Sequence, residues 1–242
     1  MKTFGLIGKN IDYSFSRNYF KEKFISEAIS DCTYVNFDIQ DISKITEVFK
    51  QNNSGYNVTI PYKQEIIPYL DKLDQNASEI GAINTIKVNS NGTLEGFNTD
   101  YIGFIESIKP HLKSHHTKAL ILGTGGASKA VAYALKKLKI DFTFVSRNPK
   151  GNEIAYHQIS ETLFKESTII INTTPTGTFP NIEEAPNIPY AYFTNKHIAY
   201  DLIYNPSETR FLKQAKENNA FIINGLQMLI LQAEAAWKIW NK

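Results

Sequence analysis

Short apolar runs alternate with stretches of helical periodicity along the chain, which is the pattern of strands followed by helices. In the first half, this pattern predicts strands at 4–8, 34–37 and 55–58, and helices at about 16–28, 42–49 and 61–70. Ser16 is the expected N-cap of the first helix, and Pro61 fits the first turn of the third. The first half therefore begins as strand–helix pairs.

A hairpin and a further helix complete the first half. Asn91-Gly92, between the apolar stretches 82–88 and 93–97, is the residue pair typical of a tight β-hairpin turn. The hairpin leads to Asn98-Thr99-Asp100 and to a helix over 101–108. Pro110 and the polar residues up to Lys118 mark the expected boundary between two α/β domains.

The second half is a longer alternation of the same kind. Its expected strands are 119–122, 142–145, 168–171, 198–203 and 221–223, and its expected helices are 127–138, one capped by Ser207, and 226–240. Continuous apolar strands are typical of a parallel sheet that helices cover on both faces. The last helix is expected to bury one stripe, made of Leu226, Leu229, Ile230, Ala233, Trp237 and Trp240.

Composition narrows the class of protein. The 242 residues are 42% hydrophobic, which suffices for sizeable cores, and 26 basic against 24 acidic residues are spread without a basic stripe. Nucleic acid is therefore not an expected partner. No apolar stretch approaches the roughly 18 residues of a membrane helix, and a single cysteine, Cys32, cannot form an internal disulfide. We expect a cytoplasmic protein.

The stretch from Gly123 to Ala127 joins a buried strand to a helix through Thr124, Gly125 and Gly126. Glycines permit a tight turn and a close approach to a ligand, and the unpaired N–H groups of a helix start favour phosphate. The stretch differs from the dinucleotide fingerprint because the third glycine is replaced by Ser128. A dinucleotide site is expected here, and a glycine turn without a ligand is the alternative.

The end of the next strand bears on the choice of dinucleotide. An NAD-binding protein usually places Asp or Glu about 20 residues past the glycines. Here the residues are Ser146-Arg147-Asn148-Pro149-Lys150, and a guanidinium can pair with a 2′-phosphate that a carboxylate would repel. This charge reversal favours NADP, unless Arg147 is only a surface charge.

Four other features allow both a structural and a chemical role. Ser14 and Ser16 at a helix start suit a carboxylate as well as a cap. Lys63 follows the end of a strand, where open α/β sheets bind ligands, but it can also be a solvated lysine. Asp100 can cap a helix or take part in chemistry, and Gln232 can border the last helix's apolar stripe or reach a ligand.

Two further features point to no site. Cys32 is expected to be a small buried residue rather than a nucleophile. His115-His116 has no acidic or cysteine cluster beside it in the sequence, so no metal is expected.

The chain resembles the shikimate dehydrogenase family over nearly its whole length, because several separate motifs occur in one order. They are Ser14-Phe15-Ser16, Asn57-Val58-Thr59-Ile60-Pro61-Tyr62-Lys63, Gly81-Ala82-Ile83-Asn84-Thr85, Gly96-Phe97-Asn98-Thr99-Asp100, the Gly123 turn, Ser146-Arg147, and Asn224-Gly225-Leu226-Gln227-Met228-Leu229 with Gln232.

The resemblance implies a fold and a reaction. The fold is a substrate domain, residues 1–101 completed by the C-terminal helix 226–242, and a Rossmann-like doubly wound NADP-binding domain, residues 102–225, with the active site in the cleft. The reaction is the reversible reduction of 3-dehydroshikimate to shikimate by NADPH, on the route to chorismate and the aromatic amino acids. A small-molecule substrate, no membrane partner, and a monomer or homodimer are expected.

The resemblance also implies residue roles. Lys63 and Asp100 match the catalytic pair, with Lys63 as the proton donor and Asp100 orienting it. Ser14 and Ser16 match the groups that bind the substrate carboxylate. Other positions that match substrate contacts are Thr59, Asn84, Tyr204 and Gln232. Those that match cofactor contacts are Gly123, Thr124, Gly125, Gly126, Ala127, Ser146, Arg147, Asn148, Lys150, Thr173, Thr174, Leu202 and Gly225.

Some positions depart from the family pattern. Asn10, Tyr13 and Arg17 replace Pro, His and Pro around the serines, and Arg17 would add positive charge near an anion. The turn after Arg147 is short, which weakens the expected preference for NADP. A quinate/shikimate dehydrogenase relative that uses NAD or both cofactors is one alternative. A non-catalytic NADP-binding regulator is another, against which the intact Lys63, Asp100 and serines argue.

Overall fold

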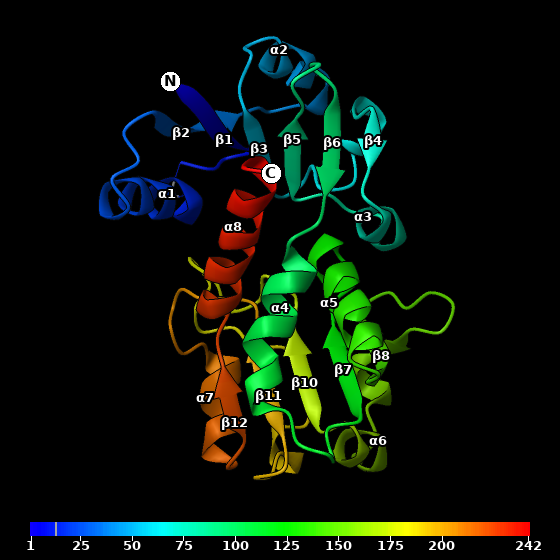
Figure 1. Ribbon diagram of the computed structural model, residues 1–242. Coiled ribbons are helices and arrows are strands. Elements are labelled where there is room, and N and C mark those ends of the chain that lie inside the picture. Colours follow the sequence, from blue (N-terminus) through cyan, green and yellow to red (C-terminus); the bar gives the residue numbers. More distant parts are fainter. Residues whose placement is uncertain (13) are drawn as a thin grey trace. The chain divides into compact units, whose positions relative to one another are not determined.

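The computed structural model describes residues 1–12 and 14–242 (Figure 1). Tyr13, one of the departures from the family pattern, lies outside the described residues. The chain forms two compact units, which we call unit 1 (Met1–Thr99 with Gln232–Lys242) and unit 2 (Asp100–Leu231). The domain boundaries expected from the sequence lay at 101/102 and 225/226. Each unit contains one six-stranded sheet.

The sheet of unit 1 is mixed, with the strand order β2-β1-β3-β5-β6-β4. Its strands are β1 (Lys2–Gly8), β2 (Cys32–Asp38), β3 (Gly55–Val58), β4 (Lys72–Leu73), β5 (Thr85–Val88) and β6 (Leu94–Phe97). β1 pairs in parallel with β2 and β3, whereas β5 runs antiparallel to both β3 and β6. The expected hairpin around Asn91-Gly92 is therefore the β5–β6 pair.

Helices cover both faces of this sheet. They are α1 (Phe15–Ser26), η1 (Ile42–Lys44), α2 (Ile45–Phe49), η2 (Ile67–Tyr69), α3 (Gln75–Ile80) and the C-terminal part of α8 (Leu226–Trp240). One core places α2 and α3 residues such as Val48 and Ala77 against Ile7 and Val58 of the sheet. The other core unites α1 and α8 through Phe20 and Trp240. α8 thereby completes unit 1, although it lies at the other end of the sequence.

The prediction of a regular α-helix over 61–70 was wrong. Residues 61–66 form successive turns, and only Ile67–Tyr69 is helical, in a 3-10 conformation. Pro68 has no N–H to donate to residue 64, and it disfavours the α conformation at Ile67. The segment therefore continues through three-residue hydrogen bonds, such as Ile67 N to the Gln64 carbonyl at 3.2 Å.

The sheet of unit 2 is entirely parallel, with the order β12-β11-β10-β7-β8-β9. Its strands are β7 (Lys118–Leu122), β8 (Asp141–Ser146), β9 (Ile154–Ala155), β10 (Ile169–Asn172), β11 (Ile198–Asp201) and β12 (Phe221–Ile223). Numbered along the chain, this is the order 3-2-1-4-5-6 of the Rossmann fold. The α/β, doubly wound fold class expected from the sequence is confirmed.

Two layers of helices enclose this sheet. The helices of unit 2 are α4 (Asp100–Ile108), η3 (Lys109–His111), α5 (Gly126–Lys137), η4 (Tyr156–Gln158), α6 (Glu161–Glu166), η5 (Tyr190–Tyr192), α7 (Arg210–Glu217) and the start of α8. Phe104 of α4 and Leu135 of α5 pack on one face of the sheet, and Phe164 of α6 and Phe211 of α7 pack on the other.

Two helix caps lie two residues from their expected positions. Ser14, not Ser16, caps α1 by accepting the Arg17 N–H, and Thr209, not Ser207, caps α7 by accepting the Leu212 N–H. Several hydroxyls near a helix start compete for the cap, and the backbone of the preceding loop decides which one faces the open N–H groups. Leu226, expected in the buried stripe of α8, is 39% exposed.

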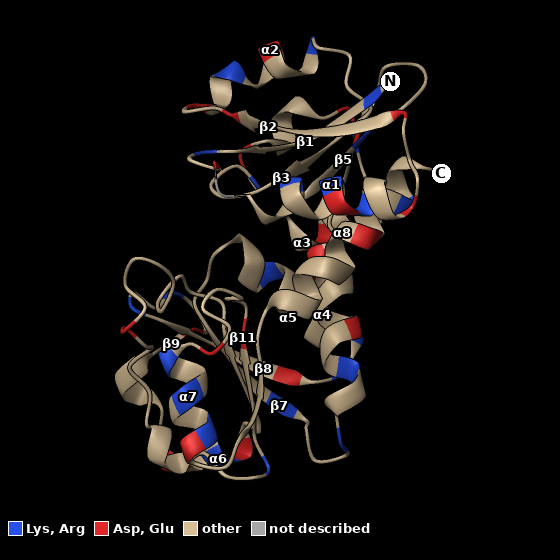
Figure 2. Cartoon of the chain, turned by 90° about the vertical axis from the view of Figure 1, so that its left-hand side faces the viewer, with Lys and Arg blue, Asp and Glu red and all other residues tan. Residues whose placement is uncertain are grey.

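Charged residues of both signs are interspersed over both units (Figure 2). Among the helices of the described residues, none has the length and apolar character needed to cross a membrane.

Candidate active site

Polar side chains gather at one edge of the sheet of unit 1, which we call edge 1. It consists of the carboxyl ends of β1, β3 and β6 and the start of β5, which are adjacent because β5 runs antiparallel to its neighbours. The segments with Ser14 and Ser16 and with Thr59 and Lys63 leave the sheet at this edge, and the segment with Asn84 enters it there. Residues far apart in the sequence are thus brought together, as expected for ligand binding by an α/β sheet.

The two serines lie at the N-terminus of α1. The Ser14 hydroxyl accepts the Arg17 N–H at 3.4 Å, and Ser16, in the first turn, is buried. Arg17 is exposed, and its guanidinium donates to the Asp12 carbonyl at 3.1 Å. Two hydroxyls and the first amides of a 12-residue helix are suitable donors for a carboxylate.

Thr59 and Lys63 lie in the turns that follow β3, and both side chains are half-buried. The Thr59 N–H donates to the Ile7 carbonyl at 2.9 Å, and the Lys63 carbonyl accepts the Ile83 N–H at 2.7 Å. The backbone of this segment is therefore tied both to β1 and to the segment that leads into β5. The Lys63 ammonium is carried on a fixed turn rather than on a free loop.

Asn84, Thr99 and Gln232 form a buried hydrogen-bonded cluster. The Asn84 side-chain amide donates to Thr99 Oγ1 at 2.9 Å and to Gln232 Oε1 at 3.2 Å, and Asn84 Oδ1 accepts the Thr99 N–H at 2.6 Å. Gln232 is 7% exposed, and its Oε1 lies in this polar cluster. This cluster attaches the C-terminal helix to edge 1.

Three further buried residues, which sequence reasoning missed as site residues, extend this cluster. Thr85 Oγ1 donates to Asn84 Oδ1 at 3.1 Å, Asn57 Nδ2 donates to Thr85 Oγ1 at 3.2 Å, and the Tyr34 hydroxyl donates to Asn57 Oδ1 at 2.8 Å. Burial raises the pKa of the Tyr34 phenol, and its hydrogen bond with the Ser16 side chain acts in the opposite direction. Asn57 and Thr85 stand in the quoted motifs, which was the available signal, whereas Tyr34 stands in none of them.

Asp100 directly follows Thr99 and is the first residue of α4. Its side chain is buried, and as an acidic residue in the first turn it complements the positive end of the helix dipole. Asp100 and Tyr204 belong to unit 2, whereas the other residues expected to bind substrate belong to unit 1.

The glycine turn lies at the corresponding edge of unit 2, which we call edge 2 and which consists of the carboxyl ends of its parallel strands. Gly123 has φ +103°, and a Cβ there would lie 2.9 Å from both Thr173 Oγ1 and Thr174 Cγ2. Gly125 is the N-cap of α5 without a side-chain cap, and a Cβ there would meet nothing within 4 Å. The turn therefore leaves open space before the N–H groups of a 12-residue helix, which fits a pyrophosphate.

Ser146 ends β8, and Arg147, Asn148 and Lys150 follow it. The Asn148 N–H donates to Ser146 Oγ at 3.2 Å, and the Lys150 N–H donates to Glu153 Oε2 at 3.0 Å. Arg147, Asn148 and Lys150 are exposed. Two cations on a short turn suit a phosphate on the ribose, although the Glu153 carboxylate lies on the same turn.

The remaining expected cofactor residues lie on the loops after β10 and β11. Thr173 donates through its N–H and its hydroxyl to the Leu122 carbonyl, at 3.0 and 2.6 Å, which holds this loop beside the glycine turn. A Cβ on Gly225 would lie 2.0 Å from the Leu202 carbonyl oxygen, so only glycine allows these two backbones to approach. Thr174, Leu202 and Tyr204 are half-buried, and burial raises the pKa of the Tyr204 phenol.

The comparisons with known proteins agree with this geometry. A family model described as the shikimate dehydrogenase substrate binding domain matches residues 6–86. A curated protein of Clostridium botulinum (strain Hall), named shikimate dehydrogenase (NADP(+)), is 40% identical over 253 aligned residues, which cover 99% of this chain and 96% of that protein. The chain belongs to the shikimate dehydrogenase family.

Solved structures of shikimate dehydrogenases have the same fold. The enzyme from Aquifex aeolicus superposes with a TM-score of 0.88 at 34% identity, covering 100% of this chain and 92% of that one. A shikimate dehydrogenase crystallised with NADP⁺ also gives a TM-score of 0.88, at 36% identity, covering 99% of this chain and 90% of that one. The likeness therefore includes both units.

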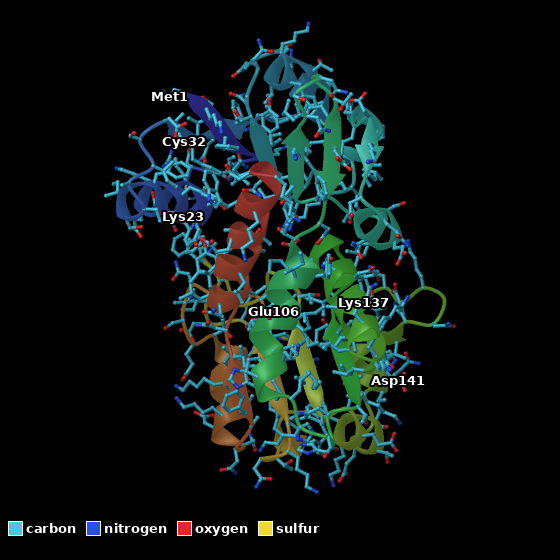
Figure 3. The ribbon with its side chains drawn as sticks, in the orientation of Figure 1. Met1, Lys23, Cys32, Glu106, Lys137 and Asp141 are labelled. Carbon is cyan, nitrogen blue, oxygen red and sulfur yellow. The ribbon has the colours of Figure 1, made fainter. Side chains whose placement is uncertain are left out.

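Cys32 and the His115-His116 pair lie apart from the sheet edges that carry the family motifs. Cys32 begins β2 and is partly buried, with burial raising the pKa of its thiol (Figure 3). His115 and His116 precede β7, and both contact the Lys196 carbonyl, each at 3.1 Å. Within residues 1–12 and 14–242, no group of three or more His, Cys, Asp or Glu side chains is arranged to hold a metal ion.

Proposed function

We propose that this chain is an NADP-dependent shikimate dehydrogenase that interconverts 3-dehydroshikimate and shikimate. The proposal rests on one observation: this member of the family has polar groups at both edge 1 and edge 2. Edge 1 has hydroxyl, amide and ammonium groups that suit a polyhydroxylated carboxylate. Edge 2 has a glycine turn at a helix start with cations at the end of the neighbouring strand.

Substrate binding is assigned to edge 1 and to Tyr204. Ser14 and Ser16 donate to the carboxylate, which the N-terminal end of α1 also stabilises. Thr59, Asn84, Gln232 and Tyr204 hold the ring hydroxyls. Asn84 and Gln232 suit this role because their mutual hydrogen bond orients both amides before a ligand arrives.

Lys63 and Asp100 are assigned the proton transfer. When bound, NADPH supplies the hydride. The Lys63 ammonium donates a proton to the carbonyl oxygen of the substrate and stabilises the negative charge that develops there, and Asp100 orients the ammonium. In the reverse direction, the same lysine accepts the proton from the hydroxyl of shikimate.

The cofactor is assigned to edge 2. The pyrophosphate lies at Gly123, Thr124, Gly125, Gly126 and Ala127, before the amides of α5. The ribose phosphate lies at Ser146, Arg147, Asn148 and Lys150. Thr173, Thr174, Leu202 and Gly225 complete the site from the neighbouring loops.

Measured turnover with each combination of two substrates and two cofactors tests this function. Purified protein is assayed with shikimate or quinate, each with NADP or NAD, by the absorbance of the reduced nicotinamide. We expect the highest kcat/KM with shikimate and NADP. A higher kcat/KM with quinate or with NAD would favour the quinate/shikimate relative, and cofactor binding without any reduction would favour a non-catalytic regulator.

A further inference from the structure

Asp201 is a fully buried carboxyl group to which the reaction gives no role. It is the last residue of β11, and it pairs in register with Asn172, the last residue of β10. Both side chains are completely buried, and both lie at edge 2, one residue before loops that carry expected cofactor contacts.

Asp201 accepts three hydrogen bonds from three different segments. Oδ2 accepts the Thr209 hydroxyl at 2.6 Å, and Oδ1 accepts the Ile203 N–H at 3.0 Å and the Asn172 side-chain amide at 3.1 Å. All three neighbours donate, so the position requires an acceptor with two oxygens. An ionised carboxylate meets that requirement, whereas an apolar residue would remove an acceptor from all three donors, of which the Asn172 amide would keep its bond to the Thr176 carbonyl at 3.3 Å.

One branch of these hydrogen bonds leads to the glycine turn. Because Asn172 Nδ2 faces Asp201, Asn172 Oδ1 faces the next loop and accepts the Thr174 N–H at 3.0 Å and the Thr174 hydroxyl at 2.6 Å. Thr173 and Thr174 are the two residues that a Cβ on Gly123 would meet. The orientation of one amide thereby sets the position of the loop that faces the pyrophosphate.

The other branch leads to the loop after β11. The Ile203 N–H fixes the backbone between Leu202 and Tyr204, and the Ile203 carbonyl accepts the Gly225 N–H at 3.0 Å. The Thr209 hydroxyl both donates to Asp201 and caps α7. Asp201 thus ties together the loops after β10 and β11.

We propose that Asp201 is a positioning residue for cofactor binding: its carboxylate holds the loops 173–177 and 202–209 in the arrangement that receives the dinucleotide. The inference rests on the proposed NADP-dependent function. It assigns Asp201 no contact with substrate or cofactor.

Two pairs of variants of the full-length protein test this role. Asp201→Ala removes all three acceptor contacts, whereas Asp201→Asn keeps one oxygen for Asn172 and Ile203. Thr209→Val removes the hydroxyl at nearly constant shape, whereas Thr209→Ser keeps it. The measurements are the Kd for NADP by titration calorimetry, kcat at saturating substrate and cofactor, and the melting temperature.

We expect Asp201→Ala to raise the NADP Kd by about tenfold or more, with kcat at saturation within about threefold of the parent. Asp201→Asn restores a large part of the affinity. Thr209→Val raises the Kd by about fivefold, and Thr209→Ser leaves it unchanged.

A folded Asp201→Ala protein that binds NADP as tightly as the parent, with only a lower melting temperature, would overturn the inference. If that variant does not fold, the Thr209 pair decides, and equal affinities of the Val and Ser variants overturn it. A parent protein that neither binds nor reduces NADP would instead refute the proposed function.

Discussion

Single residues at edge 1 combine structural and chemical roles. Ser14 caps α1 and is also assigned to the substrate carboxylate. Gln232 is a buried residue of α8, and its Oε1 accepts a hydrogen bond from the Asn84 side-chain amide. A cap and a ligand contact use different parts of one hydroxyl, because the oxygen accepts from the backbone while its hydrogen can still donate. The two roles can therefore be separated only by substitutions that keep one and remove the other.

The proposed proton donor has a direct test. Lys63→Ala is expected to lower kcat by about 10²- to 10⁴-fold, because proton transfer from a positioned group contributes that much to the rate. Lys44→Ala serves as the matched control, since Lys44 is an exposed lysine of unit 1 that pairs only with Glu47 among the ion pairs of the described residues. Steady-state kinetics with both substrates saturating measures the effect. Turnover of the Lys63 variant within tenfold of the parent would exclude the lysine as the donor.

Ser14→Asp separates capping from carboxylate binding. Aspartate is as good an N-cap as serine, so the stability of α1 is kept, but its charge repels the substrate carboxylate. We expect the KM for shikimate to rise by more than about tenfold, with little change in melting temperature. Ser160→Ala removes the matched cap of α6 in unit 2 and should lower stability without changing this KM. An unchanged KM in Ser14→Asp would remove Ser14 from the substrate site.

At the scale of elements, the glycine turn shows two different reasons for glycine. Gly123 is required by its positive φ and by contact with Thr173 and Thr174, so its role is to let the chain turn. Gly125 has an ordinary backbone conformation and open space around it, so nothing in the fold of unit 2 excludes a side chain there. The space at Gly125 is explained if a ligand fills it.

The same substitution at these two glycines should therefore have different consequences. Gly125→Ser introduces a good N-cap residue and should keep the melting temperature, but its side chain enters the space assigned to the pyrophosphate and raises the NADP Kd. Gly123→Ser should lower stability by about 1 to 3 kcal/mol, because serine is strained at this φ. Thermal unfolding and calorimetric titration distinguish the two effects. NADP affinity equal to the parent's in Gly125→Ser would contradict the assigned cofactor site.

At the scale of the whole molecule, each unit contains a carboxyl group whose ionisation changes stability with pH, and the two changes have opposite sign: Asp201 is fully buried and Glu234 is partly buried. Burial raises the pKa of Asp201 in unit 2 to about 6, and the hydrogen bonds from Thr209, Ile203 and Asn172 only partly offset it. In unit 1, burial alone would raise the pKa of Glu234, but hydrogen bonds with Lys23 and Tyr19 outweigh it and lower that pKa. Lys23, on α1, is labelled in Figure 3.

These shifts predict the pH dependence of stability. Folded Asp201 binds its proton more tightly than the unfolded residue, so its ionisation costs stability as pH rises from about 4 to about 6, by about 3 kcal/mol in total. Relative to the parent, Asp201→Asn should therefore become more stable as pH rises from about 4 to 7. Glu234 stabilises the fold above its unfolded pKa of about 4.5, and this contribution is lost as pH falls below that value. Relative to the parent, Glu234→Gln should therefore become less stable as pH rises through the acid range up to about 4.5, which is the opposite trend. Denaturant unfolding at several pH values measures both, and parallel trends would contradict the assignment.

Local sequence largely determined the helices and strands and the functional residues at their ends. Alternating apolar runs such as 119–122 and 169–171 predict buried strands, and the glycines and the Ser146-Arg147 pair predict a dinucleotide site, because these signals depend on neighbouring residues. The irregular segment after Pro61 and the choice of Ser14 over Ser16 as cap were not predictable, since the surrounding turns decide between nearly equivalent local conformations.

Only the tertiary structure decided which side chains meet. Asn84 and Gln232 are 148 positions apart, yet they share a hydrogen bond, and Asn172 and Asp201 lie side by side because their strands are paired in register. Hydrophobic periodicity predicts which face of a helix or strand is buried, but it does not predict which other helix or strand packs against that face. The order of strands in each sheet sets that partner, and with it the polar network at each edge.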